Sequence, residues 1–156
     1  CISVAEKLNN AEGKAIPGGG SSILFSCTLN SIRSPIAEAL MKRLTGTKYY
    51  VDSAGLRSAP INPMAVRVMA ELDYDLTKHR SKTFDDLGDM SFDLIITLSP
   101  EAHHRALEVT RLQACDVENW PTFDPLLQEG NADQRMDAFR QVRDSLNRKL
   151  YKRFSI

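Results

Sequence analysis

The chain has 156 residues, 42% of them hydrophobic, which suits the core of one domain and is too short for two ordinary ones. Twenty basic residues balance twenty acidic ones, so the zero net charge gives no general attraction to nucleic acid or to an anionic membrane. No apolar run approaches the roughly 20 residues of a membrane span, and three cysteines without C-x2-C spacing argue against a disulfide framework or a zinc site. The composition therefore predicts a cytoplasmic protein without a metal or other cofactor.

The first residues differ from the rest of the chain. A polar, amphipathic stretch over residues 2–15 is followed by Pro17-Gly18-Gly19-Gly20, which is typical of a flexible linker. The sequence thus predicts an N-terminal extension with a glycine-rich linker over residues 1–21 and a folded domain over residues 22–156.

From Ser22 onward, short apolar runs alternate with longer segments of helical period. The short runs predict strands over residues 23–26, 49–53, 92–98 and 116–120. The longer segments predict helices over residues 35–44, 62–72, 100–109 and 132–150. This alternation predicts an α/β fold with a parallel sheet between helices, and such sheets bind ligands beyond the carboxyl ends of their strands.

The loop after the first predicted strand reads Cys27-Thr28-Leu29-Asn30-Ser31-Ile32-Arg33-Ser34 and leads into a helix. A phosphate site needs inward-facing backbone N–H groups, the positive end of a helix and a guanidinium, and this loop has the means to supply all three. The same groups stabilise a thiolate, which predicts Cys27 as a nucleophile with Arg33 and the loop residues binding phosphate. Asn30 suits a position with positive φ, and the Ser34 hydroxyl is placed to donate to the sulfur. The alternative reading of Cys27 is a small buried residue at a strand end.

Five further segments accompany this loop in the same order as in a known family: Pro35-Ile36-Ala37-Glu38-Ala39, Val51-Asp52-Ser53-Ala54-Gly55, His79-Arg80-Ser81-Lys82, residues 92–97, and Asp124-Pro125 with Gly130. From about Ile23 to Leu150 the chain resembles the low-molecular-weight protein tyrosine phosphatases. The resemblance implies a four-stranded parallel sheet flanked by helices on both faces, of the flavodoxin-like phosphotyrosine phosphatase I type.

The resemblance also implies metal-independent hydrolysis of phosphate monoesters through a phosphocysteine on Cys27, with Asp124 as general acid. It implies that Asn30, Ser53 and His79 support the loop by hydrogen bonds. The expected substrate is a phosphorylated protein or a small phosphate monoester.

Several positions depart from the family pattern. Leu29 stands where a glycine is usual, and Ile32 stands where many members have a second cysteine. Without that second thiol, oxidation of Cys27 is expected to be irreversible. Leu56-Arg57 and Leu126-Leu127 replace the aromatic residues that wall the pocket in members that favour aryl phosphates.

Three alternatives remain open from the sequence: a phosphate-recognising binding module with little turnover, an arsenate reductase, and a flavodoxin-like domain that binds phosphate without consequence. Thioredoxin-coupled arsenate reductases pass a disulfide along further cysteines near the third strand. Here that region has Ser99, and the next cysteine is Cys115. Turnover of an aryl phosphate that is lost in Cys27→Ser would distinguish an enzyme from the two alternatives that only bind phosphate.

Overall fold

The computed structural model describes residues 21–88 and 91–155, so nearly all of the predicted extension and linker lies outside the described residues. Its centre is a parallel sheet of four strands in the order β2-β1-β3-β4. The strands are β1 (Ser22–Cys27), β2 (Tyr50–Gly55), β3 (Leu94–Thr97) and β4 (Asp116–Asn119). All neighbouring strands pair in parallel, as the alternation of strands and helices predicts.

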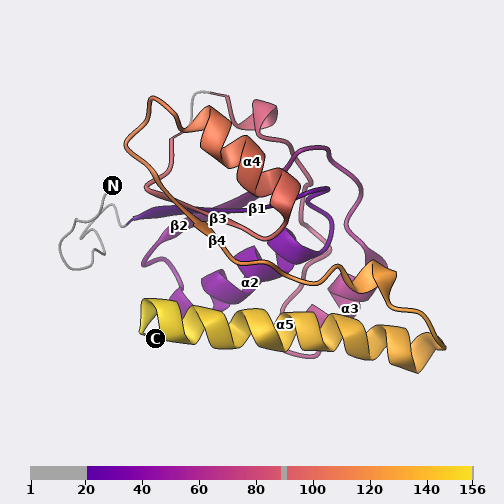
Figure 1. The fold of residues 1–156 in the computed structure, drawn as a ribbon. Coiled ribbons are helices and arrows are strands. Elements are labelled where there is room, and N and C mark those ends of the chain that lie inside the picture. The colour runs from indigo at the N-terminus through magenta and orange to yellow at the C-terminus, as the bar shows by residue number, and fades with distance from the viewer. Residues whose placement is uncertain (1–20, 89–90, 156) are drawn as a thin grey trace.

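Four helices cover the sheet, as Figure 1 shows: α4 lies on one face, and the other three lie on the opposite face. They are α2 (Arg33–Thr45), α3 (Pro63–Ala70), α4 (Pro100–Val109) and α5 (Ala132–Phe154), with short 3-10 turns η1 (Asp85–Leu87) and η2 (Pro125–Leu127). The predicted fold class is confirmed. No helix within the described parts of the chain is long and apolar enough to cross a membrane.

The alternation of side chains along β1 divides the core between the two faces. Ile23, Phe25 and Cys27 face the larger core with α2 and α5, whereas Leu24 faces the smaller core on the α4 side. Because all but the first residue of β1 are buried, the strand is fixed from both sides. Cys27 is therefore held at the carboxyl edge of the sheet, where the loop toward α2 begins.

Apart from α4, every predicted element has at least one boundary that differs from the structure, by one to four residues. The third strand begins at Leu94 instead of residue 92, and the last helix continues past Leu150 to Phe154. The extra helical turn is held by tertiary contact, since the Phe154 ring packs edge-on against Tyr49 with centroids 5.7 Å apart. A single sequence does not reveal such a contact.

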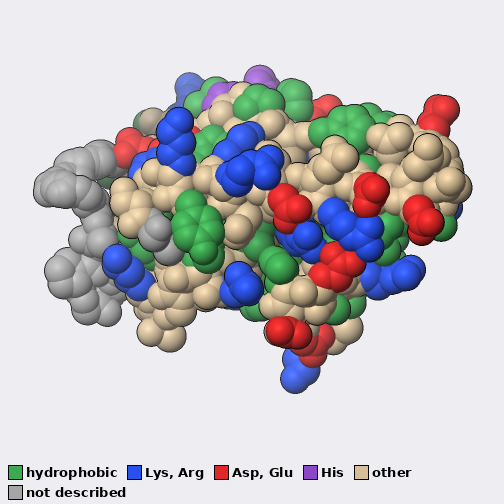
Figure 2. Space-filling view, turned by 90° about the horizontal axis from the view of Figure 1, so that it is seen from below, with side chains coloured by type: hydrophobic (Ala, Val, Ile, Leu, Met, Phe, Trp, Pro, Cys, Tyr) green, Lys and Arg blue, Asp and Glu red, His purple; other side chains and the backbone are tan. Residues whose placement is uncertain are grey.

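Charged side chains link α3 to α5. Figure 2 shows acidic and basic groups interspersed on the molecular face that α5 covers. Glu71 accepts hydrogen bonds from Arg140 Nη2 at 2.9 Å and from Arg143 Nη1 at 2.7 Å, and Arg143 Nη1 also donates to the Val68 carbonyl at 2.8 Å. The two guanidinium groups, Arg140 first, lower the pKa of Glu71 from 4.5 to about 2.

Glu71→Gln is expected to lower the free energy of unfolding at neutral pH by about 1 kcal/mol, because the Glu71 side chain is 39% exposed and solvent screens its ion pairs. The folded-state pKa is depressed, so this stabilisation is fully present above about pH 4.5 and is lost as the pH falls toward 2. Thermal unfolding of the wild type and the variant between these pH values measures it. Glu129→Gln, on an exposed loop, is the control, and a difference in stability that does not change with pH would contradict the assignment.

Candidate active site

The loop between β1 and α2 turns its carbonyl groups outward. Backbone N–H groups of the segment after β2 hold these carbonyls at 2.9 to 3.2 Å: Leu56 and Arg57 donate to Thr28, Ala59 donates to Leu29, and Asn62 donates to Ser31. Each peptide N–H points opposite to its carbonyl, so the loop's N–H groups face the interior of the loop. Successive inward N–H groups form a cradle for an anion.

The N-terminus of α2 adds to this cradle. Asn62, Ser99 and Asn131 cap the other three described α-helices through their side chains, whereas α2 has no side-chain cap and no acidic residue in its first turn. Its first N–H groups and the positive end of its dipole are left for a bound oxyanion.

Gly55 at the end of β2 lies directly against the loop. A Cβ atom at this position would lie 2.8 Å from Asn30 N, 2.8 Å from Arg57 O and 2.9 Å from Thr28 O, all of them backbone atoms. Because real Cβ contacts are not this short, any other residue would push the loop out of position.

Gly55→Ala is therefore expected to weaken binding of inorganic phosphate by at least about tenfold and to destabilise the fold by about 1 to 3 kcal/mol. Calorimetric titration and thermal unfolding measure the two effects. Gly46→Ala is the control for phosphate binding, since Gly46 has φ 60°, so the substitution strains the backbone, but the added carbon has no heavy atom within 4 Å. Equal phosphate affinity in both variants would show that Gly55 does not shape the cradle.

The sulfur of Cys27 lies within hydrogen-bond distance of Ser34 behind the loop. Cys27 Sγ lies 2.9 Å from Ser34 Oγ, and Asn30 Nδ2 donates to the same Ser34 Oγ at 2.8 Å. A thiolate has no proton and only accepts, so Ser34 is the donor when the sulfur is ionised. A hydroxyl that donates to sulfur stabilises the thiolate over the thiol.

Asn30 is the centre of a buried hydrogen-bond network. It adopts φ 54°, which confirms the prediction of a positive φ at this position. Its side-chain nitrogen donates to Ser34 and to Ser53 Oγ, the latter at 2.9 Å. Its side-chain oxygen accepts from Lys82 N at 2.9 Å and contacts His79 Nε2 at 3.1 Å.

The His79 contact defines the tautomer, because an amide oxygen only accepts and Nε2 must carry the proton. Burial lowers the pKa of His79, which favours the neutral ring, although the Glu38 carboxylate 3.8 Å from Nδ1 opposes this effect. Ser53 and His79 thus both contact Asn30, in the supporting positions that the resemblance implies.

Glu38 is the member of this network that the sequence analysis does not assign a role. Its carboxylate accepts a hydrogen bond from Ser53 Oγ at 2.5 Å and forms an ion pair with Lys42. One feature of the sequence could have indicated such a role: Glu38 is the only charged residue in the helical stretch 34–41, all of which is buried.

Asp124 and Arg33 come together at the mouth of the loop. Arg33 Nη1 donates to the Thr122 carbonyl at 3.1 Å, which ties the cradle to the segment that carries Asp124. Asp124 Oδ1 accepts from Leu126 N at 3.0 Å and so caps the short helix η2, while Oδ2 forms no hydrogen bond with the described residues. Cys27, Arg33 and Asp124 line one pocket of about 430 Å³.

The remaining predicted residues divide into two groups. Thr28, Leu29, Ser31 and Ile32 also line the pocket, whereas Asn30 and Ser34 lie behind the loop and are not part of its lining. Leu29 is not among the described residues with positive φ, so its backbone conformation does not require a glycine.

Comparison with known proteins agrees with this architecture. The model of the low molecular weight phosphotyrosine protein phosphatase family matches residues 22–154. An arsenate reductase of Halalkalibacterium halodurans is 33% identical over 130 residues, which cover 82% of this chain and 91% of the relative.

Two solved structures are also similar. One is a cysteine-to-serine mutant of the YwlE arginine phosphatase with a phosphorylated active-site serine, with TM-score 0.69, 25% identity, and coverage of 86% of this chain and 95% of that one. The other is a protein tyrosine phosphatase, with TM-score 0.69, 26% identity, and coverage of 83% and 90%. The chain belongs to the low molecular weight phosphotyrosine protein phosphatase family.

Proposed function

We propose that the protein hydrolyses phosphate monoesters, with phosphotyrosine in proteins as the substrate class, through a phosphocysteine on Cys27 and with Asp124 as general acid and base. The observation that carries this proposal is the outward turn of the loop carbonyls, because it directs a ring of N–H groups into the pocket that Cys27 and Arg33 line. Membership of the phosphatase family supports the same chemistry.

In the first step the Cys27 thiolate attacks phosphorus in line with the ester oxygen, so that an S–P bond forms as the P–O bond breaks. The loop N–H groups and the Arg33 guanidinium bind the three equatorial oxygens, on which charge accumulates. Asp124, protonated at the start, gives its proton to the leaving oxygen.

In the second step water attacks the phosphocysteine. Asp124, now ionised, takes a proton from the water, and the S–P bond breaks to release inorganic phosphate and restore the thiolate. The Ser34 hydroxyl, 2.9 Å from the sulfur, stabilises the thiolate as it leaves.

The arsenate reductases among the relatives make that reaction the second candidate, since arsenate has the size and charge to enter the same cradle. A reductase that works through a disulfide needs a second thiol near Cys27. The other described cysteine, Cys115, lies at the end of the sheet opposite to Cys27. It directly precedes Asp116, and the pairings of Asp116 with Leu94 and of Leu94 with Ile23 place it level with the start of β1.

Four strand residues at about 3.3 Å each separate Ile23 from Cys27, and β3 lies between β1 and β4. The two cysteines are therefore well beyond the roughly 7 Å between Cα atoms that a disulfide tolerates. Burial and the neighbouring Asp116 also raise the pKa of Cys115 to about 12, which keeps it a thiol. These facts favour hydrolysis over reduction.

The same cysteine arrangement predicts how the protein responds to peroxide. Cys27 is expected to pass from sulfenic to sulfinic acid because no other thiol of the described residues lies near enough to intercept the sulfenic acid, and dithiothreitol should restore less than about a tenth of the activity. Ile32→Cys adds a thiol beside Arg33 on the wall of the same pocket and should make most of the loss reversible. Full recovery of the wild type would contradict this prediction.

The experiment that tests the proposed function is hydrolysis of p-nitrophenyl phosphate without added metal between about pH 5 and 7, with acid quench and mass spectrometry of the enzyme. Turnover with one phosphoryl group on Cys27 is expected, as is turnover of a phosphotyrosine peptide. Faster turnover of a phosphoarginine peptide would reassign the substrate class. Arsenate-dependent oxidation of thioredoxin would favour the arsenate reductase function. Binding of phosphate without turnover would show that the protein recognises phosphate groups and does not hydrolyse them.

A further inference from the structure

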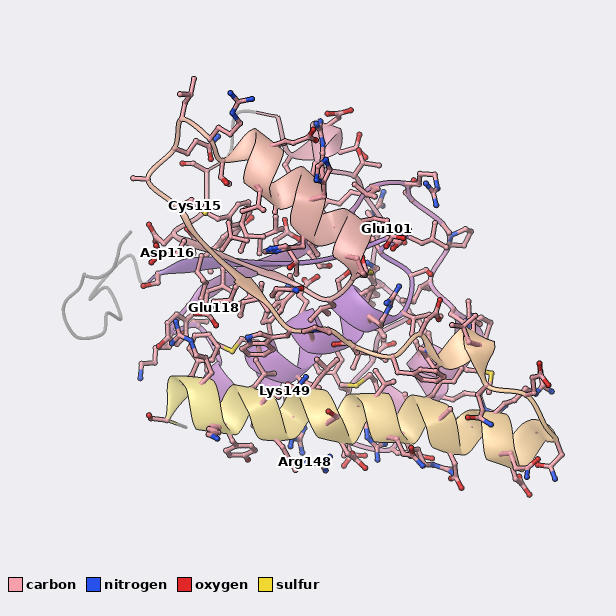
Figure 3. All side chains as sticks on the ribbon, viewed as in Figure 1. Glu101, Cys115, Asp116, Glu118, Arg148 and Lys149 are labelled. Atoms are coloured by element: carbon pink, nitrogen blue, oxygen red, sulfur yellow. The ribbon has the colours of Figure 1, made fainter. Side chains whose placement is uncertain are left out.

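Two charged side chains at the mouth of the pocket have no role in the proposed reaction steps. Arg57 follows β2, and Glu101 lies in the first turn of α4, where Figure 3 labels it at the helix end nearest the carboxyl edge of the sheet. Both are exposed and both contribute to the lining of the pocket. Neither forms an ion pair within the described residues, either with the other or with a third group.

The strand order puts these two charges on opposite sides of Cys27. In the sheet β2-β1-β3-β4, Cys27 ends the inner strand β1, with the segment bearing Arg57 on the β2 side and the helix bearing Glu101 on the β3 side. Thr28 separates them: its carbonyl accepts from Arg57 N at 3.0 Å, and its hydroxyl donates at 3.1 Å to Ser99, the residue that caps α4. The mouth is thus positive on one side and negative on the other.

A small phosphate ester held in the cradle does not span both sides of the mouth. An extended peptide does, because its residues advance about 3.3 Å each, so side chains two positions before and after the phosphorylated residue lie about 7 Å to either side. Leu126 and Leu127, 53% and 69% exposed on the same rim, offer apolar surface to the intervening chain. A nucleic acid fits poorly, because Glu101 would face its phosphates.

We propose that the mouth of the pocket recognises the order of charged residues along a phosphoprotein substrate. Arg57 pairs with an acidic side chain on one side of the phosphorylated residue, and Glu101 pairs with a basic side chain on the other side. This inference rests on the proposed phosphatase function and names the substrate segment for that site. Because the two rim charges differ in sign, a segment with the reversed charge order meets like charges at both ends.

The test uses two phosphotyrosine peptides of identical composition. One has aspartate two positions before and lysine two positions after the phosphotyrosine, and the other has these two residues exchanged. Wild-type kcat/KM is expected to differ about tenfold between them, since each exposed ion pair changes affinity by a factor of a few. The preference should appear in KM and should shrink at 1 M salt.

The double variant Arg57→Glu with Glu101→Arg is expected to invert the preference. Arg57→Gln with Glu101→Gln should abolish it, which keeps the test decisive if the charge-exchanged variant does not fold. Equal wild-type rates on both peptides would overturn the inference, as would a preference that survives either double variant. Hydrolysis of p-nitrophenyl phosphate separates the two proposals: if it proceeds without any peptide preference, only the inference fails, whereas its absence in the wild type defeats the proposed function.

Discussion

Cys27→Ser is expected to lower hydrolysis of p-nitrophenyl phosphate by at least about 10⁴-fold while inorganic phosphate and vanadate still bind. A serine hydroxyl is not ionised near neutral pH and is a much weaker nucleophile than a thiolate. The cradle does not depend on the sulfur, because its carbonyls are held by the 56–62 segment and its helix N-terminus belongs to α2. Binding and turnover should therefore separate in this variant.

Steady-state kinetics and calorimetric titration with phosphate measure the two quantities on the same preparation. Cys115→Ser is the matched control, since Cys115 lies at the opposite end of the sheet and its pKa of about 12 keeps it protonated. It should retain the wild-type rate. Turnover in Cys27→Ser within tenfold of the wild type would exclude the phosphocysteine, and loss of phosphate binding would mean that the sulfur itself shapes the cradle.

Asp124→Asn is expected to reduce kcat/KM for phenyl phosphate, which reports the first step alone, by about 10² to 10³-fold and to affect kcat/KM for p-nitrophenyl phosphate much less. Phenolate is the poorer leaving group and depends more on protonation by an acid. The substitution suits the site, because an asparagine Oδ1 can accept the Leu126 N–H bond that Asp124 Oδ1 accepts and so preserve the cap of η2. The loss should therefore reflect the missing proton donor and not a displaced loop.

Rates for a series of aryl phosphates with leaving groups of different acidity measure this effect. The dependence on leaving-group acidity should steepen in the variant. Asp133→Asn in the exposed first turn of α5 is the control. An unchanged dependence on the leaving group would remove Asp124 from the acid role.

Local sequence patterns were sufficient for the order and kind of the elements. The apolar run before Cys27 forms a buried strand because both of its faces are covered, and residues 100–109 form α4 with the predicted bounds because Ser99 caps the helix and Pro100 begins it. The spacing of Cys27 and Arg33 along the loop also places both residues on the lining of one pocket. Boundaries that depend on distant contacts, such as the last turn of α5 against Tyr49, did not follow from the pattern.

What the sequence by itself determined is therefore the set of groups in the cradle: a thiol, a short loop, an arginine and a helix N-terminus lie within eight consecutive residues. Only the tertiary structure decided how this cradle is supported. Glu38 and Ser53 are 15 residues apart, Asn30 and His79 are 49 apart, and Arg33 and Thr122 are 89 apart, yet each pair is in contact. Such contacts arise because parallel strands bring their carboxyl ends to one edge of the sheet, and that edge exists only after the chain has folded.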